Sequence, residues 1–159
     1  MLYIIDANNV AGKLKMLKQK NFDLKLIELF KEFNQEKNKE IELVFDGGDT
    51  MGDKKIVDNK LTVIYSPKDA FYSSADDKIV EMTERCVNRE KKDITVVTDD
   101  NGLQKRIEEL GERYNININL ERATAWAEKL TKKDNGDTIE VLQQKDKDEI
   151  NQELLQYWV

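Results

Sequence analysis

Three short apolar segments of the sequence each end in aspartate, and this recurrence limits the folds that the chain can adopt. The segments and the acids that follow them are Leu2–Ile5 with Asp6, Ile41–Phe45 with Asp46, and Ile94–Thr98 with Asp99 and Asp100. Short segments rich in β-branched residues and bounded by polar residues are typical of buried strands. Segments with helical spacing lie between them, which favours βαβ units and a mainly parallel sheet.

The same patterns predict the order of elements along the chain. The expected strands are Leu2–Ile5, Ile41–Phe45, Leu61–Tyr65, Ile94–Thr98 and, at an edge, Ile116–Leu120. The expected helices span about residues 9–18, 22–33, 74–88, 102–110, 124–130 and 138–157, with Gly111 terminating the fourth. The segment up to about Asn59 is polar and is expected to be a loop. We therefore expect an α/β fold with three layers (α/β/α), a compact domain over residues 1–131, and an acidic helical extension over residues 132–159.

The aspartates are candidate metal ligands because the carboxyl ends of parallel strands meet at one edge of the sheet, where ligands bind. The pair Asp76-Asp77 opens the third long helix at the same edge. Crowded carboxylates raise one another's pKa values, and a divalent cation removes that conflict. Mg²⁺ or Mn²⁺ suits a site made only of oxygen ligands. The candidate ligands are Asp6, Asp46, Asp76, Asp77, Asp99 and Asp100, with Asn9 as a further site residue.

Several of these residues also have a purely structural explanation. Asp6 could simply cap the turn after its strand, Asp46 precedes two glycines, as in many turns, and Asn8 and Asn9 could only cap a helix. Residues 73–77 contain the capping pattern Ser-x-x-Asp twice, so either acid of that segment could simply stabilise the helix N-terminus.

Composition excludes several kinds of chemistry. The chain has no histidine and one cysteine, Cys86, so Ser-His-Asp and Cys-His catalysis, histidine acid-base chemistry and the usual zinc sites are excluded. It has no G-x-x-x-x-G-K-[ST] loop, so no nucleotide cofactor is expected. The absence of a basic leader, a long apolar segment and paired cysteines predicts a cytoplasmic protein without a membrane partner.

The net charge of −6 does not exclude a nucleic-acid partner, because the charge is unevenly spread. Residues 134–159 carry a balance of −5, which leaves −1 for the other 133 residues. If about five acids of that larger part belong to a metal site, the rest of its surface is mildly basic.

Five motifs in order resemble the NYN domain, particularly its YacP-like bacterial branch. They are Tyr3–Gly12, Val44–Gly47, the strand and helix start in Val63–Ser66 and Ser74–Ile79, Val96–Asp100, and Arg122–Trp126. The sequence departs from the family pattern at Ala7, Asn8 and Asp99. These departures keep the carboxylates, so they bear on substrate preference more than on metal binding. The motifs cover about residues 1–130, and the tail lies outside them.

The resemblance implies a PIN-like fold and a metal-dependent endoribonuclease. Matched residue by residue, it makes Asp6, Asp76 and Asp100 the metal ligands, with Asn9 and Asp46 in support. The expected partner is RNA, including mRNA associated with the ribosome, and the expected products carry a 5′-phosphate and a 3′-hydroxyl. Two alternatives remain open: a non-catalytic RNA- or ribosome-binding module of the same fold, and a phosphohydrolase acting on small esters.

Several side chains are candidates for holding RNA. The phosphate-binding candidates are Lys13, Lys54, Lys55 and Lys68. Phe71 and Tyr72 could stack on bases, or they could pack before the helix cap as a hydrophobic staple. The lysines of the first helix, Lys13 among them, could equally form an ordinary solvated helix surface.

Overall fold

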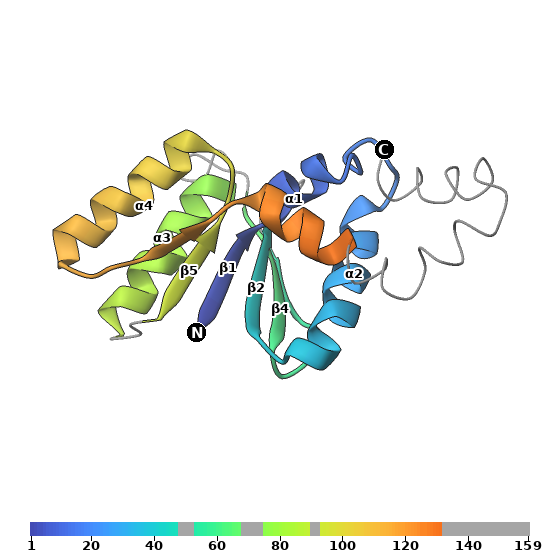
Figure 1. The fold of residues 1–159 in the computed structure, drawn as a ribbon, viewed down its shortest axis with the longest axis horizontal. Helices are drawn as coiled ribbons and strands as arrows, with labels where there is room; N and C mark the ends of the chain where they lie inside the picture. The colour runs from blue at the N-terminus through green and yellow to red at the C-terminus, as the bar shows by residue number, and fades with distance from the viewer. Residues whose placement is uncertain (48–52, 68–74, 90–92, 132–159) are drawn as a thin grey trace, which may run out of the picture.

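The computed structural model describes residues 1–47, 53–67, 75–89 and 93–131, which form one twisted sheet between two layers of helices (Figure 1). The strands are β1 (Leu2–Asp6), β2 (Glu40–Phe45), β3 (Asp53–Ile56), β4 (Leu61–Tyr65), β5 (Ile94–Val97) and β6 (Asn119–Glu121). The helices are α1 (Ala7–Lys13), α2 (Phe22–Lys37), α3 (Ala75–Asn88), α4 (Asn101–Tyr114) and one over residues 123–131. The strand order is β3-β4-β2-β1-β5-β6, and β3 alone is antiparallel to its neighbour.

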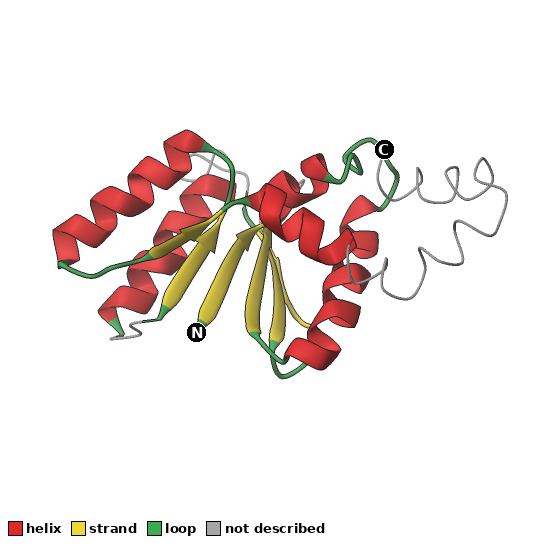
Figure 2. Ribbon diagram, viewed as in Figure 1, coloured by secondary structure: helices red, strands yellow, loops and turns green. Residues whose placement is uncertain are grey.

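The central strand β1 shows why the sheet needs a helix layer on each face. All five of its residues are buried, and successive side chains point to opposite faces. Tyr3 and Ile5 join the core under α1, α2 and the helix of residues 123–131, whereas Leu2 and Ile4 join the core under α3 and α4 (Figure 2). The expected three-layer α/β/α fold with a mainly parallel sheet is thereby confirmed.

The side chain of Trp126 packs the last described helix, residues 123–131, against the sheet. Trp126 is fully buried, and its ring lies 5.2 Å from that of Tyr3, 5.9 Å from Phe30 and 5.6 Å from Phe33. Its indole N–H donates to Glu121 at 2.8 Å, so its polar atom is also paired. The helix is therefore part of the same core as α2.

The polar segment after β2 contains a strand that the sequence patterns missed. Residues 53–56 were expected to be in a loop, but β3 pairs with β4 along the edge of the sheet. The prediction was wrong because Asp-Lys-Lys-Ile shows no alternation of apolar residues. Lysines on an edge strand are nevertheless common, since their charge discourages pairing with a further strand.

Three helix ends also differ from the expectations, and the first is that of α2, which extends to Lys37 and not only to about residue 33. Helix α1 ends at Lys13 and not near Lys18, because Lys15 takes the left-handed conformation and Met16 donates its N–H back to Ala11. This is a Schellman ending, which glycine usually provides. Helix α4 continues past Gly111 to Tyr114 and ends at Asn115, which is also left-handed.

The expected linker and the acidic extension over residues 132–159 lie outside the described residues, so that division of the chain stays a prediction. Among the described helices, none is long and apolar enough to cross a membrane.

Candidate active site

The carboxyl ends of β1 and β5 lie at the point where the strand order reverses. From β1 the chain moves to β2 on one side, whereas α3 later carries it across to β5 on the other side. Such a reversal opens a crevice beyond the strand ends, the usual ligand position in open parallel sheets. Asp6 ends β1, and Asp99 and Asp100 follow β5.

Asp6 is the most deeply buried acid of this edge, with only 6% of its surface exposed. The buried hydroxyl of Thr98 donates to its Oδ2 at 3.1 Å, and the backbone N–H of Asn9 also hydrogen-bonds the carboxylate. Burial, followed by repulsion from Asp76, raises the pKa of Asp6 to about 7 despite these hydrogen bonds, and Asp46 adds to the rise. These hydrogen bonds hold the carboxylate in place but do not fully offset the cost of burying its negative charge.

Asp76, in the first turn of α3, connects Asp6 electrostatically to the other strand ends. Its burial raises its pKa, and repulsion from Asp100 and Asp46 raises it further, while Arg106 opposes the shift. Four carboxylates from four separate segments are therefore linked by repulsion: Asp76 with Asp6, Asp46 and Asp100, and Asp6 with Asp46. We call these four residues the aspartate cluster.

Two members of the aspartate cluster also cap helices. Oδ1 of Asp46 accepts from the N–H of Ala75 at 2.6 Å, at the start of α3. Oδ1 of Asp100 accepts from the N–H of Leu103 at 3.0 Å, at the start of α4. Both acids thus satisfy free N–H groups of a helix end and sit where the helix dipole favours negative charge.

Asn8 and Asn9 hold the neighbouring strand ends in register. Both lie inside α1 rather than at its N-cap, which is Asp6, so the expectation that they cap the helix was wrong. The side chain of Asn8 accepts from the N–H of Asp46 at 2.8 Å, and that of Asn9 accepts from the N–H of Asp99 at 2.7 Å. The first turn of α1, which follows β1, is therefore hydrogen-bonded to the segments that follow β2 and β5.

Asp99 and Asp77 are directed to partners outside the aspartate cluster. Burial raises the pKa of Asp99, but hydrogen bonds from Thr124 and the nearby Lys13 hold it below its usual value. Asp77 forms an ion pair with Arg106 of α4 at 3.1 Å. Neither acid is among those that the structure draws together around Asp6, and a metal-binding role for either stays a prediction.

The chemistry of the aspartate cluster suits an oxygen-preferring cation. Its members offer carboxylate oxygens, which Mg²⁺ and Mn²⁺ favour, and their mutual repulsion is what a cation would relieve. In the part of the chain that the structure describes, however, no group of three or more acidic or cysteine side chains stands ready to hold a metal ion. The carboxylate oxygens are of the kind that such an ion binds, but the side chains are not arranged as a complete set of ligands.

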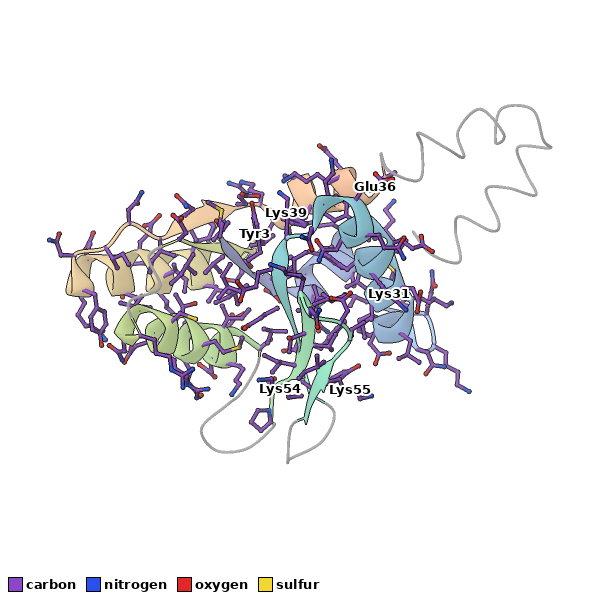
Figure 3. All side chains as sticks on the ribbon, turned by 90° about the horizontal axis from the view of Figure 1, so that it is seen from below. Tyr3, Lys31, Glu36, Lys39, Lys54 and Lys55 are labelled. Atoms are coloured by element: carbon purple, nitrogen blue, oxygen red, sulfur yellow. The ribbon has the colours of Figure 1, made fainter. Side chains whose placement is uncertain are left out.

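The candidate RNA-binding lysines occupy three different settings. Lys13 pairs with Asp99, its Nζ lying 3.4 Å from Oδ2. Lys54 and Lys55 lie next to each other on β3 at the edge of the sheet (Figure 3), and Lys55 lies 5.7 Å from the centre of the Tyr65 ring. Lys68, Phe71 and Tyr72 lie outside the described residues.

Three residues of the site were missed by the sequence patterns. Thr98 both donates to Asp6 and accepts from the N–H of Asp100 at 3.1 Å, so it links β1 to β5. A hydroxyl directly before two acids at a strand end is a signal that could have identified it. Asn8 was considered only as a cap, and Arg106 lies more than one turn into α4 without any local signal.

The comparisons with known proteins agree with this architecture. The family model of the YacP-like NYN domain matches residues 3–159, and so it extends through the tail that the motifs left out. No curated protein matches the chain, and no solved structure does so either. NYN domains have a nuclease fold, which suggests a nuclease-like, RNA-related function. Because the match covers nearly the whole sequence, the chain belongs to the YacP-like NYN domain family.

Proposed function

We propose that the protein is an endoribonuclease that hydrolyses RNA phosphodiesters with the help of a divalent cation. The observation that carries the proposal is the aspartate cluster, in which the buried Asp6 has a pKa of about 7. Buried groups with strongly perturbed pKa values tend to mark functional sites. The hydrogen bonds that Asp6 accepts from Thr98 and from the N–H of Asn9 do not fully offset the cost of burying its charge.

The residues of the site have distinct roles in the proposal. Asp6, Asp76 and Asp100 would hold Mg²⁺ or Mn²⁺, with Asp46 in support. When bound, the cation would offset the negative charge of the phosphodiester and activate a water molecule. Thr98 positions Asp6 through its hydroxyl. Asn9 donates its backbone N–H to Asp6 and uses its side chain to place Asp99, so it acts as a positioning residue.

The test is cleavage of a labelled single-stranded RNA by the full chain, with Mg²⁺ or Mn²⁺ and with EDTA. We expect cleavage only with the cation, products with a 5′-phosphate and a 3′-hydroxyl, and a loss of at least about a hundredfold in Asp6→Asn and Asp100→Asn. Asp93→Asn is the matched control, because Asp93 is an exposed acid at the opposite end of β5. Full activity in the two site variants would overturn the assignment.

A non-catalytic RNA- or ribosome-binding module is the second candidate function. It is favoured by the lack of a ready metal-binding group among the described residues and by the use of Asp46 and Asp100 as helix caps. Tight RNA binding that is unaffected by cations, without any turnover, would support this module and exclude the enzyme.

A further inference from the structure

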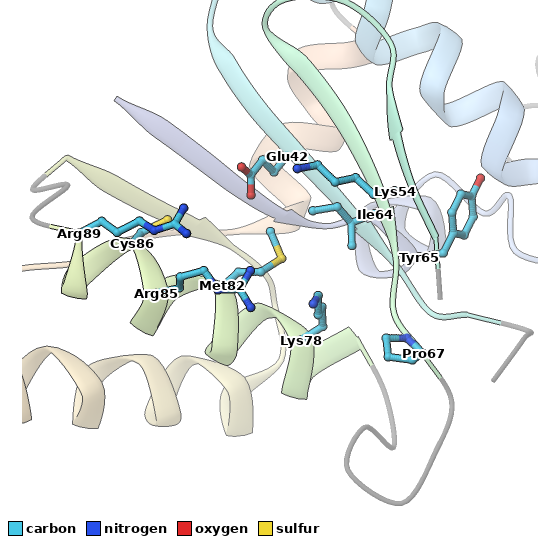
Figure 4. A pocket seen from close by; sticks show the side chains of 10 residues that line it. All are labelled: Glu42, Lys54, Ile64, Tyr65, Pro67, Lys78, Met82, Arg85, Cys86 and Arg89. Carbon is cyan, nitrogen blue, oxygen red and sulfur yellow. The ribbon is translucent and has the colours of Figure 1, made fainter. Parts of the chain in front are cut away.

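A groove with a basic lining lies beside α3 (Figure 4). It is on the side of the helix where the sheet continues from β2 to β4 and then to β3. Its volume is about 420 Å³. Helix α3 packs against β1 and β2, and the β4–β3 side of the sheet continues past it. Lys54 of β3 pairs in register with Ile64 of β4, and both line the groove opposite α3.

The lining carries an excess of positive charge. Lys54, Lys78, Arg85 and Arg89 contribute four cations, and Glu42 is the acid among the lining residues. Glu81 of α3, just outside the lining, pairs with both Lys78 and Arg85. With that acid included, the balance is still about +2. The groove is therefore opposite in charge to the aspartate cluster.

The cations of α3 form a stripe along one side of the helix, with Met82 between Lys78 and Arg85. Lys78, Arg85 and Arg89 face the groove together with Met82, at spacings of three and four residues that place them on one face of α3. An α-helix rises about 1.5 Å per residue, so the stripe from Lys78 to Arg89 is about 16 Å long. Lys78 lies in the first turn of α3, as Asp76 does, but residues two apart on a helix point to different sides, so the stripe runs along a different side of α3 from Asp76.

The groove combines these cations with an apolar floor. Ile64 and Met82 are buried to more than nine tenths and lie between Lys54 on one wall and the arginines on the other. A positively charged groove that follows the phosphate backbone is how proteins hold single strands without reading their sequence.

We infer that this groove, which we call the α3 groove, binds the phosphate backbone of single-stranded RNA. The identity of the strand as RNA rests on the proposed function. The inference that the groove binds an anionic strand rests on its shape and on the positive charge of its lining. Its residues contribute to binding and not to the chemical step.

The test is a binding measurement that does not depend on cleavage. Fluorescence anisotropy of a labelled single-stranded RNA of about 12 nucleotides is followed with the full chain in EDTA at several salt concentrations. The test variant is Lys54→Gln/Arg89→Gln, which changes one cation on each wall. Its matched control is Lys31→Gln/Lys105→Gln, because Lys31 on α2 and Lys105 on α4 are exposed lysines outside the groove.

Each phosphate contact to a single strand contributes about 0.7 to the slope of log K against log salt, so the test variant should lower that slope by about 1.4. If the affinities converge near 1 M salt, this corresponds to about 60-fold weaker binding at about 50 mM. The control should bind like the wild type. The charge-preserving variant Lys54→Arg/Arg89→Lys should keep most of the affinity, which excludes a general folding defect as the cause.

Two results would overturn the inference: binding by the test variant within about twofold of the control, or displacement of the RNA by an acidic peptide of equal charge. The second result would identify the groove as a protein-docking surface. The outcome is separable from that of the proposed function. Groove-dependent binding without cleavage would refute only the enzyme, whereas cleavage with groove-independent binding would refute only the α3 groove.

Discussion

Replacing Asp6 by asparagine should stabilise the metal-free protein at neutral and alkaline pH. Asp6 is buried in the folded chain, where its pKa is about 7 compared with an ordinary value of 3.8. As the pH rises from about 4 to about 7, the unfolded chain releases this proton while the folded chain retains it. The unfolded state then binds fewer protons, so the free energy of unfolding falls with rising pH.

The size of the effect follows from the two pKa values. The free energy of unfolding should fall by about 1.4 kcal/mol per pH unit between pH 3.8 and pH 7, or by about 4 kcal/mol in total. Asparagine has the same shape and keeps an oxygen that can accept from Thr98, but it cannot ionise. The Asp6→Asn variant should therefore exceed the wild type by up to about 4 kcal/mol at about pH 8 and differ little near pH 4.

The assay is urea unfolding in EDTA at several pH values, followed by tryptophan fluorescence, since Trp126 is fully buried. Asp93→Asn removes one exposed acidic charge elsewhere and should leave the pH dependence unchanged. If Asp6→Asn is no more stable than the wild type at about pH 8, or shows the same pH slope, then Asp6 is not the uncompensated charge inferred here.

Further predictions address the cation, the core and the site. Millimolar Mg²⁺ should raise the melting temperature of the wild type but not of Asp6→Asn, as calorimetry would detect. Trp126→Ala should lower the free energy of unfolding by about 3–5 kcal/mol in urea. Gly111→Ala should cost about 1–3 kcal/mol in the same assay, because its Cβ would lie 2.8 Å from the Ile116 carbonyl oxygen. Thr98→Val removes a hydrogen bond that lowers the pKa of Asp6, so titration followed by NMR should find that pKa raised further.

The layers of the fold were predictable because burial on both faces leaves a clear pattern. Each of the parallel strands β1, β2, β4 and β5 is a short apolar segment in the sequence, and α2 and α3 begin within about one residue of the expected positions. The gathering of Asp6, Asp46, Asp76 and Asp100 at one edge follows from parallel strand direction alone. These features depend on periodicity and topology, which one sequence displays.

The features that were missed depend on contacts between distant segments or on unusual backbone conformations. Lys15 and Asn115 end helices in the left-handed conformation, which asparagine is known to adopt but which a lysine does not signal. Position 111 needs glycine because the carbonyl oxygen of Ile116 lies where a Cβ atom would be. A local sequence pattern does not show that approach. The pairing of β3 with β4 likewise depends on a neighbour and not on the composition of β3.

The sequence patterns presented helix capping and metal binding as alternatives for Asp76 and Asp77. In the structure the acids that cap helices are Asp46 and Asp100, and there the two roles are compatible. A carboxylate has two oxygens and about four lone-pair sites, and the cap bonds of Asp46 and Asp100 use Oδ1 in each case. Each cap bond also fixes the direction of its carboxylate, at the start of a helix whose dipole favours the charge. Capping is therefore compatible with the proposed role of these acids as ligands of a shared cation. Asp6 differs because its hydrogen-bond donors, Thr98 and the N–H of Asn9, leave its pKa near 7. Among the members of the aspartate cluster, Asp6 thus carries the charge that a nearby cation would stabilise most. Its replacement is therefore the sharpest test of the site.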